Sequence, residues 1–126
     1  MASYQGFDVV KERYQQEITT IDMARDFSPT PLGRHRSQGR FSGQAFREDL
    51  LKPALERAYI VRVDLDGVTG LSTGVLDEAF GGLVRDRTLK MGEFFERVKI
   101  IATRDPGVVD EVRAFVSRAD QQLSAH

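Results

Sequence analysis

A serine and a threonine at an expected helix start are the side chains best suited to chemistry in this chain. Ser72 and Thr73 precede a run from Val75 to Val84 in which apolar residues recur at the spacing of one helix face. There, their hydroxyls would lie beside unpaired amides and the positive end of the helix dipole, a setting that stabilises phosphate. A kinase could use either hydroxyl as a switch. The simpler alternative, which the residue types favour, is that they are ordinary helix N-caps.

Two aspartates end the preceding apolar, β-branched run. A spacing of two in a strand would place the carboxylates of Asp64 and Asp66 on one face, where they could bind a metal or act as an acid and a base. We favour the alternative that Asp66 and Gly67 form a turn and that Asp64 is a strand-end carboxylate. No nucleophile and base stand together, so a hydrolase is the least favoured function. We predict no catalytic residue, no metal ligand and no cofactor.

One segment of the chain is strongly basic. Arg34, His35, Arg36 and Arg40 alternate with glycine and serine in a stretch that also contains two prolines, which predicts a loop or irregular hairpin. Guanidinium groups and backbone amides there could hold a phosphate or an acidic partner surface, close to a helix start at Ser42. The alternative is a flexible, solvated loop.

The hydrophobic pattern gives the elements that must position these groups. Alternating β-branched residues predict strands, and apolar residues at helical spacing predict helices, in this order: strand 17–24, irregular hairpin 25–42, helix from Ser42, strand 59–65, helix 72–84, strand 95–103, and a closing helix from Asp105. We expect Pro53 to kink the first long helix and Gly81-Gly82 to mark a close backbone approach. Strands alternating with helices predict a small α/β sandwich, with a mixed four-stranded sheet and helices mainly on one face.

Length and composition restrict the class of protein. The chain has 126 residues, 40% of them hydrophobic, which suits one domain with its own core. We expect an N-terminal arm or short helix over 1–16, the domain over 17–121 and a frayed end over 122–126. Eighteen basic and 19 acidic residues give a net charge of -1, so neither nucleic acid nor a membrane is expected as a partner. The absence of cysteine and of a long apolar span favours a cytoplasmic protein.

Two segments, which contain the starts of the two expected long helices, resemble a known family. The run VDLDGVTGLSTGVLDEAFGGL and the upstream PLGRHRSQGRFSGQAFREDLLKP are similar to the bacterial STAS-like domain proteins of unknown function, a branch distantly related to the anti-sigma factor antagonists. The resemblance spans 18–119 and is most specific over 39–43, 64–70 and 76–82. It implies a STAS-like fold and a regulatory, non-enzymatic role.

The resemblance also implies a site. In the better known antagonists, the loop before the second helix resembles Asp-Ser-Ser-Gly, and its first serine is phosphorylated by an ATPase-fold kinase that is also the binding partner. On this chain the aspartate position is Ser72, the phosphorylated serine is Thr73 and the second serine is Gly74, so the aspartate is missing. The implied partner is a histidine-kinase-type ATPase. It would bind the loop and helix of residues 69–80, which include Asp77.

A second function remains open from the residues themselves. The chain could be a nucleotide- or anion-binding domain in which Arg34, Arg36 and Arg40 hold a phosphate near Ser42. The sequence identifies neither the partner nor the oligomeric state, and a homodimer is compatible with it.

Overall fold

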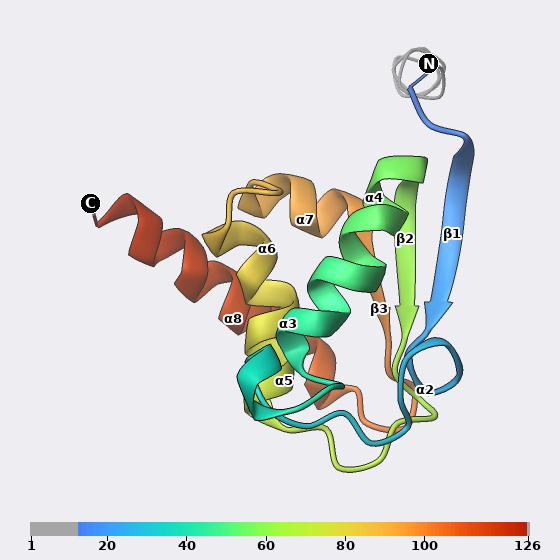
Figure 1. Cartoon of the computed structure of the whole chain (residues 1–126). Coiled ribbons are helices and arrows are strands. Elements are labelled where there is room, and N and C mark those ends of the chain that lie inside the picture. Colours follow the sequence, from blue (N-terminus) through green and yellow to red (C-terminus); the bar gives the residue numbers. More distant parts are fainter. Residues whose placement is uncertain (1–12, 126) are drawn as a thin grey trace.

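The computed structural model describes residues 13–125, which form a parallel sheet packed against helices (Figure 1). The strands are β1 (Gln16–Asp22), β2 (Ala58–Asp64) and β3 (Val98–Ile101). The helical segments are α2 (Met23–Asp26), the 3₁₀ turn η1 (Arg36–Gln38), α3 (Gly43–Phe46), the π turn η2 (Arg47–Leu51), α4 (Lys52–Arg57), α5 (Thr73–Leu76), the π turn η3 (Asp77–Gly81), α6 (Gly82–Arg85), α7 (Met91–Arg97) and α8 (Gly107–Ser124).

The sheet has three strands in the described part of the chain, in the order β1-β2-β3, and both pairings are parallel. The expected mixed sheet of four strands is therefore wrong in both strand number and direction. Val61 and Val63 point to the face that the helices cover and are fully buried, whereas Arg62 between them is exposed on the other face. Thr20 of β1 and Lys99 of β3 flank Arg62 on that exposed face. All the large helices in Figure 1 lie on the buried side.

Two long helices carry the candidate site residues, and each contains a π turn. The first is continuous from Gly43 to Arg57, and the second is continuous from Thr73 to Arg85. Pro53 does not end the first helix. Because proline has no amide hydrogen to donate to the turn before it, that turn must rearrange, and the π turn η2 lies immediately upstream.

The core between the sheet and the helices contains three fully buried phenylalanines. Phe46 belongs to α3, Phe80 to η3 and Phe94 to α7. The Phe80 ring makes edge-to-face contacts with the other two, with centroid separations of 6.3 Å to Phe46 and 6.2 Å to Phe94. Edge-to-face pairs add to the stability gained from burying the rings. This row fixes both long helices and α7 against one another.

The segment before β3 differs from the sequence prediction. Phe95 and Glu96, expected at the start of a strand, belong to helix α7, and β3 begins only at Val98. Phe94 is buried and Phe95 is half-buried. Two adjacent aromatic residues just before a β-branched run are typical of a strand. The segment is nevertheless a helix, and Glu93 caps its start by accepting a hydrogen bond from the Lys90 amide.

The described residues include only the last part of the expected N-terminal arm. Most of the expected N-terminal arm, residues 1–12, lies outside the described residues. Tyr14 packs edge-to-face on Tyr59 at 5.8 Å, and β1 begins at Gln16. Helix α8 continues to Ser124, through most of the segment expected to fray. Within residues 13–125, no helix combines the length and the apolar character needed to cross a bilayer.

Candidate functional site

The candidate site lies at the carboxyl ends of the strands, where both long helices begin (Figure 1). Parallel α/β sheets bind ligands at this edge because the loops that follow the strands meet there. The loop after β2 is joined to the segment before the basic loop, since the Thr69 amide donates to the Pro29 carbonyl at 2.9 Å. The predicted serine-threonine pair and the predicted basic segment therefore occupy the same edge.

The start of the second long helix is open. Ser72 is the N-cap, and its Oγ accepts a hydrogen bond from the Val75 amide at 3.2 Å, as the simpler interpretation of this serine predicts. Thr73 follows as the first helical residue and is exposed. Within residues 13–125, neither the Thr73 hydroxyl nor the amides of Thr73 and Gly74 have a hydrogen-bond partner. This helix start therefore offers an accessible hydroxyl beside two free amide donors.

The start of the first long helix is closed. Ser42 is fully buried, and its Oγ accepts from the Ala45 amide at 3.1 Å. The amides of Gly43 and Gln44 donate to the carbonyls of Gly33 and Arg34, each at 2.9 Å. All three amides of the first turn are thus already bonded within the chain, so no free donor is left there for an anion.

The arginines of the basic segment have partners. Arg34 Nη1 lies 2.7 Å from Asp77 Oδ2, and Arg36 contacts Asp49 at 2.6 Å and Glu48 at 3.1 Å. The hydrogen bonds from Arg36 hold the pKa of the Asp49 carboxyl below its ordinary value. These ion pairs compensate much of the positive charge that the sequence shows, which weighs against a phosphate site in this loop.

Arg40 differs from the other two arginines. Its guanidinium lies 5.3 Å from the centroid of the Phe41 ring, and no carboxylate in the described part of the chain pairs with it. Phe41 and Leu32 are both exposed hydrophobic residues, and the Leu32 amide donates to the Phe41 carbonyl. The tip of the basic segment is therefore apolar as well as cationic.

Arg34 brings the basic segment onto the open helix start. A Cβ atom added at Gly74 would lie 3.1 Å from Arg34 Cγ, so the glycine leaves room for the arginine to cross the first turn. Asp77 is half-buried because it binds Arg34 on one side and Arg85 Nη1, at 3.0 Å, on the other. Thr73, Gly74, Asp77 and Arg34 consequently form one surface.

We predict that Asp77 makes the free energy of unfolding depend on pH in the acidic range. Burial acts to raise the pKa of its carboxyl, but the hydrogen bonds from Arg34 and Arg85 outweigh this, so the pKa lies below its ordinary value. The unfolded value is about 3.9, so the stabilisation is present at neutral pH. It decreases as the pH falls towards that value and is lost below the folded pKa. Urea unfolding from pH 7 to pH 2.5 should show a shallower loss for Asp77→Asn than for the wild type; parallel curves would contradict the prediction.

Asp64 and Asp66 make the turn that the sequence favoured. The Asp66 amide donates to Asp64 Oδ1 at 2.9 Å, while Asp66 accepts from the Thr103 hydroxyl at 2.6 Å and from the Arg104 amide at 3.2 Å. These bonds, that from Thr103 first, lower the pKa of the Asp66 carboxyl. Asp66 therefore joins the loop after β2 to the loop after β3. No three histidine or acidic side chains gather as metal ligands anywhere in residues 13–125.

A hollow adjoins the open helix start. A cavity of about 230 Å³ lies between the loop after β2 and the beginning of α8. Leu65, Val68, Leu71 and Leu76 form much of its apolar lining, and Arg104 is among the charged residues around it. Such a hollow can receive an apolar side chain of a partner, the usual anchor in a protein interface.

Arg47 is a buried arginine between the two long helices that was not predicted from the sequence. Its side chain is 8% exposed and lies 3.2 Å from Glu78 Oε1. It also donates to the Glu78 carbonyl, and its Nε lies 3.2 Å from Asp86 Oδ2 without the alignment of a hydrogen bond. Its guanidinium occupies the space beside Gly82, where a Cβ would clash. The sequence feature that could have identified Arg47 is its single charge next to Phe46, on a helix face that is otherwise apolar.

The other glycine of the pair also marks a close approach. A Cβ at Gly81 would lie 3.3 Å from the Phe115 carbonyl of α8 and 2.7 Å from Asp77 Oδ1. The close backbone approach predicted from Gly81-Gly82 is therefore found at Gly81, whereas Gly82 makes room for a side chain.

A comparison with models of protein families assigns the chain to a family. The model of the STAS-like domain of unknown function (DUF4325) matches residues 42–108. The chain belongs to this STAS-like family. The match takes in both helix starts and the segment 69–80, and it begins at Ser42, after the arginines of the basic segment. No curated protein and no solved structure matches the chain significantly.

Proposed function

We propose that this STAS-like domain is a non-enzymatic regulatory module that binds a protein partner through residues 69–80 and is switched by phosphorylation of Thr73. The observation that carries the proposal is the contrast between the two serine-capped helix starts. The start at Ser42 is buried with its amides bonded, whereas the start at Ser72 presents an exposed threonine and two free amides. Membership of the STAS-like family supports a regulatory role of this kind.

A phosphate on Thr73 would have a defined effect on its surroundings. It would add a charge of about -1.5 to -2 at the positive end of the helix dipole, which favours the modified state. Arg34 crosses the same turn and is held only by Asp77 within the described part of the chain. The phosphate would compete with Asp77 for Arg34, so one modification would change both the charge of the surface and the position of the basic segment.

The surface also suits protein contact. The hollow next to Leu71 and Leu76 offers an apolar anchor site, and Arg104 lies beside it. Charged groups around an apolar anchor steer a partner and set its orientation. An ATPase of the histidine-kinase type is the partner that the STAS-like resemblance implies, and a cytoplasmic location would give it access to ATP.

We expect the native protein to carry phosphate on Thr73. Intact-mass and peptide mass spectrometry of protein purified from its natural host should find this modification, together with a stoichiometric ATPase in the same sample. Ser72 is the second candidate, but its hydroxyl is engaged with the Val75 amide. An unmodified chain purified without an ATPase would contradict the proposal.

Substitution separates the switch from simple loss of a contact. Thr73→Glu should weaken binding of the isolated partner by about tenfold or more, which corresponds to about 1.4 kcal/mol, while Thr73→Ala should bind like the wild type. Thr20→Glu is the matched control, because Thr20 lies opposite Arg62 on the exposed sheet face and accepts the same change of charge. Equal binding by Thr73→Glu and Thr73→Ala in calorimetry would exclude the switch.

Anion binding through Arg34, Arg36 and Arg40 near Ser42 remains the alternative function. The closed helix start and the ion pairs of Arg34 and Arg36 weigh against it. A thermal-shift panel of nucleotides tests it directly, because a ligand at 100 times its Kd should stabilise the protein by about 2.7 kcal/mol. For this alternative, the stabilisation must disappear in Arg34→Gln or Arg36→Gln.

A further inference from the structure

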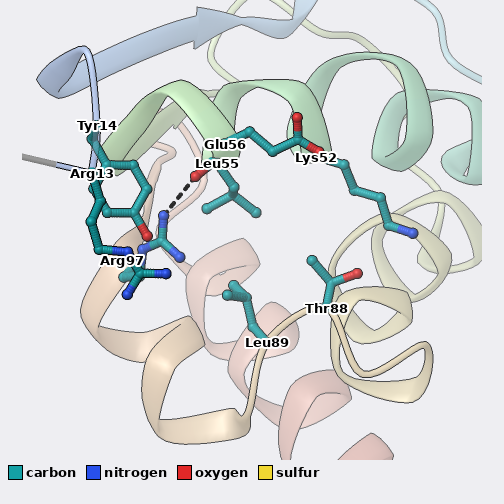
Figure 2. Close-up of a pocket in the computed structure, with 8 residues that line it drawn as sticks. All are labelled: Arg13, Tyr14, Lys52, Leu55, Glu56, Thr88, Leu89 and Arg97. Atoms are coloured by element: carbon teal, nitrogen blue, oxygen red, sulfur yellow. Dashed lines mark hydrogen bonds between the residues drawn. The ribbon is translucent and has the colours of Figure 1, made fainter. Parts of the chain in front are cut away.

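The other end of the sheet contains a cavity of about 510 Å³ (Figure 2). It lies at the amino ends of the strands, where α4 leads into β2 and α7 leads into β3. Its lining residues are Arg13, Tyr14, Lys52, Leu55, Glu56, Thr88, Leu89 and Arg97. Cavities of this volume are typical of small-molecule sites in proteins. Neither the family match nor the proposed function assigns it a role.

The cavity wall includes a buried arginine without a carboxylate partner. Arg97 is 8% exposed, and no acidic side chain within residues 13–125 lies within ion-pair distance of it. Its Nε donates to the Tyr59 carbonyl at 2.8 Å, and its Nη2 donates to the carbonyls of Leu55 and Ala58 at 2.8 and 3.1 Å. Buried charges in proteins normally have an ionic partner because desolvating them is costly.

The contacts of Arg97 hold its guanidinium in one orientation but engage only its Nε and Nη2 groups in hydrogen bonds. Carbonyls at the end of α4 supply only about half an opposite charge through the helix dipole. The guanidinium also lies against the rings of Tyr14 and Tyr59, whose centroids are 5.0 and 5.1 Å from Cζ. Its Nη1 group has no hydrogen-bond partner among the described residues and is not fully buried, so a fixed, accessible donor remains at the cavity wall.

The remaining lining residues complete an anion site with an apolar wall. Arg13 and Lys52 add two cations to Arg97, against the single carboxylate of Glu56 in the lining, although Lys52 also contacts Asp86 at 2.9 Å. Leu55 and Leu89 are apolar, and Figure 2 shows their side chains between Arg97 and Tyr14 on one side and Lys52 on the other. The charges favour an anion, while the leucines and the tyrosine ring favour an organic body attached to it.

We propose that this cavity binds a small organic phosphate, with the phosphate on Arg97 and Arg13 and the organic group against Leu55, Leu89 and Tyr14. The site is at the opposite end of the sheet from Thr73, and the inference does not depend on the proposed switch. It also differs from the anion site that the sequence suggested, because it uses none of the arginines of the basic segment.

Isothermal titration calorimetry of the full chain with phenyl phosphate, adenosine monophosphate and inorganic phosphate tests the proposal. At least one of the two organic phosphates should bind with one-to-one stoichiometry and more tightly than inorganic phosphate, because only these ligands reach the apolar wall. Absence of saturable binding by both organic phosphates would overturn the inference, as would equal affinity for inorganic phosphate.

Variants locate the binding. Arg13→Gln should weaken binding of the organic phosphate by about tenfold, and the change lies at an exposed position. Arg62→Gln, the same change on the exposed sheet face, and Arg34→Gln, in the basic segment, should have no effect. Equal weakening by Arg62→Gln would mean general charge attraction, and weakening only by Arg34→Gln would place the site in the basic segment; either result would overturn the proposal.

Discussion

Replacing Arg47 by alanine should destabilise the domain by about 3 kcal/mol or more, the cost of removing one partner of a buried ion pair. The guanidinium lies 3.2 Å from both Glu78 Oε1 and Asp86 Oδ2 and fills the space beside Gly82. Without it, Glu78, whose side chain is only 14% exposed, keeps a carboxylate next to Asp77 with one cation fewer nearby. Urea unfolding, followed by circular dichroism, measures the change in the free energy of unfolding.

Two further variants show whether the loss arises from the unpaired charge. Arg47→Met combined with Glu78→Gln removes both charges and keeps most of the volume, so it should be clearly more stable than Arg47→Met alone. Arg57→Ala, an exposed arginine at the end of the same helix, should change stability by less than about 1 kcal/mol. If Arg47→Ala costs no more than Arg57→Ala, the buried ion pair has no structural importance.

Arg47 and Glu78 also explain how the two π turns are related. Arg47 is in η2, Glu78 is in η3, and the two turns are in contact between the long helices. A π turn widens the helix and changes the direction of its carbonyls, and the Glu78 carbonyl accepts a hydrogen bond from Arg47. The ion pair therefore fixes the spacing of the helices, and with it the position of the helix start that carries Thr73.

The elements of this fold were predictable where one local signal dominated. The alternation around Val61 and Val63 predicted β2, and the serine N-caps predicted both long helices. Helix α7 was missed because it has only two turns and Phe95 adjoins the β-branched residues of β3. The expectation of a fourth strand came from the architecture rather than from a further β-branched run, and the described chain contains none.

The candidate site was predictable in its parts but not in their arrangement. Thr73 and Arg34 could each be chosen from residue type and neighbours. Their meeting depends on an ion pair between Arg34 and Asp77, which are 43 positions apart, and on the absence of a side chain at Gly74. Hydrophobic periodicity describes only neighbouring residues, so it cannot predict a contact between residues so far apart in the chain. Arg97 was overlooked for the same reason, since its partners are carbonyl groups about 40 residues earlier in the chain.

Gly43→Ala should destabilise the domain by about 2–3 kcal/mol, although alanine normally favours a helix over glycine by about 1 kcal/mol. Gly43 lies where the first long helix packs tightly against the second. A Cβ there would lie 2.6 Å from the Val75 carbonyl oxygen, 2.9 Å from Glu78 Cβ and 3.2 Å from the Ala79 amide nitrogen. Two of these three atoms belong to the backbone of a helix, so the helices must move apart to accept the methyl group. Thermal and urea unfolding measure the loss.

Gly92→Ala is the matched control for the same substitution. Gly92 is also near the start of a helix, α7, but apart from its chain neighbours and the backbone of its own helix, a Cβ added to it would have no atom within 4 Å. Alanine should therefore stabilise the domain there by up to about 1 kcal/mol, through its higher helix propensity and the reduced freedom of the unfolded chain. The two variants should shift stability in opposite directions. If both stabilise it, the helices at Gly43 are not in tight contact, and the positions of Arg34 and Thr73 are not set by that contact.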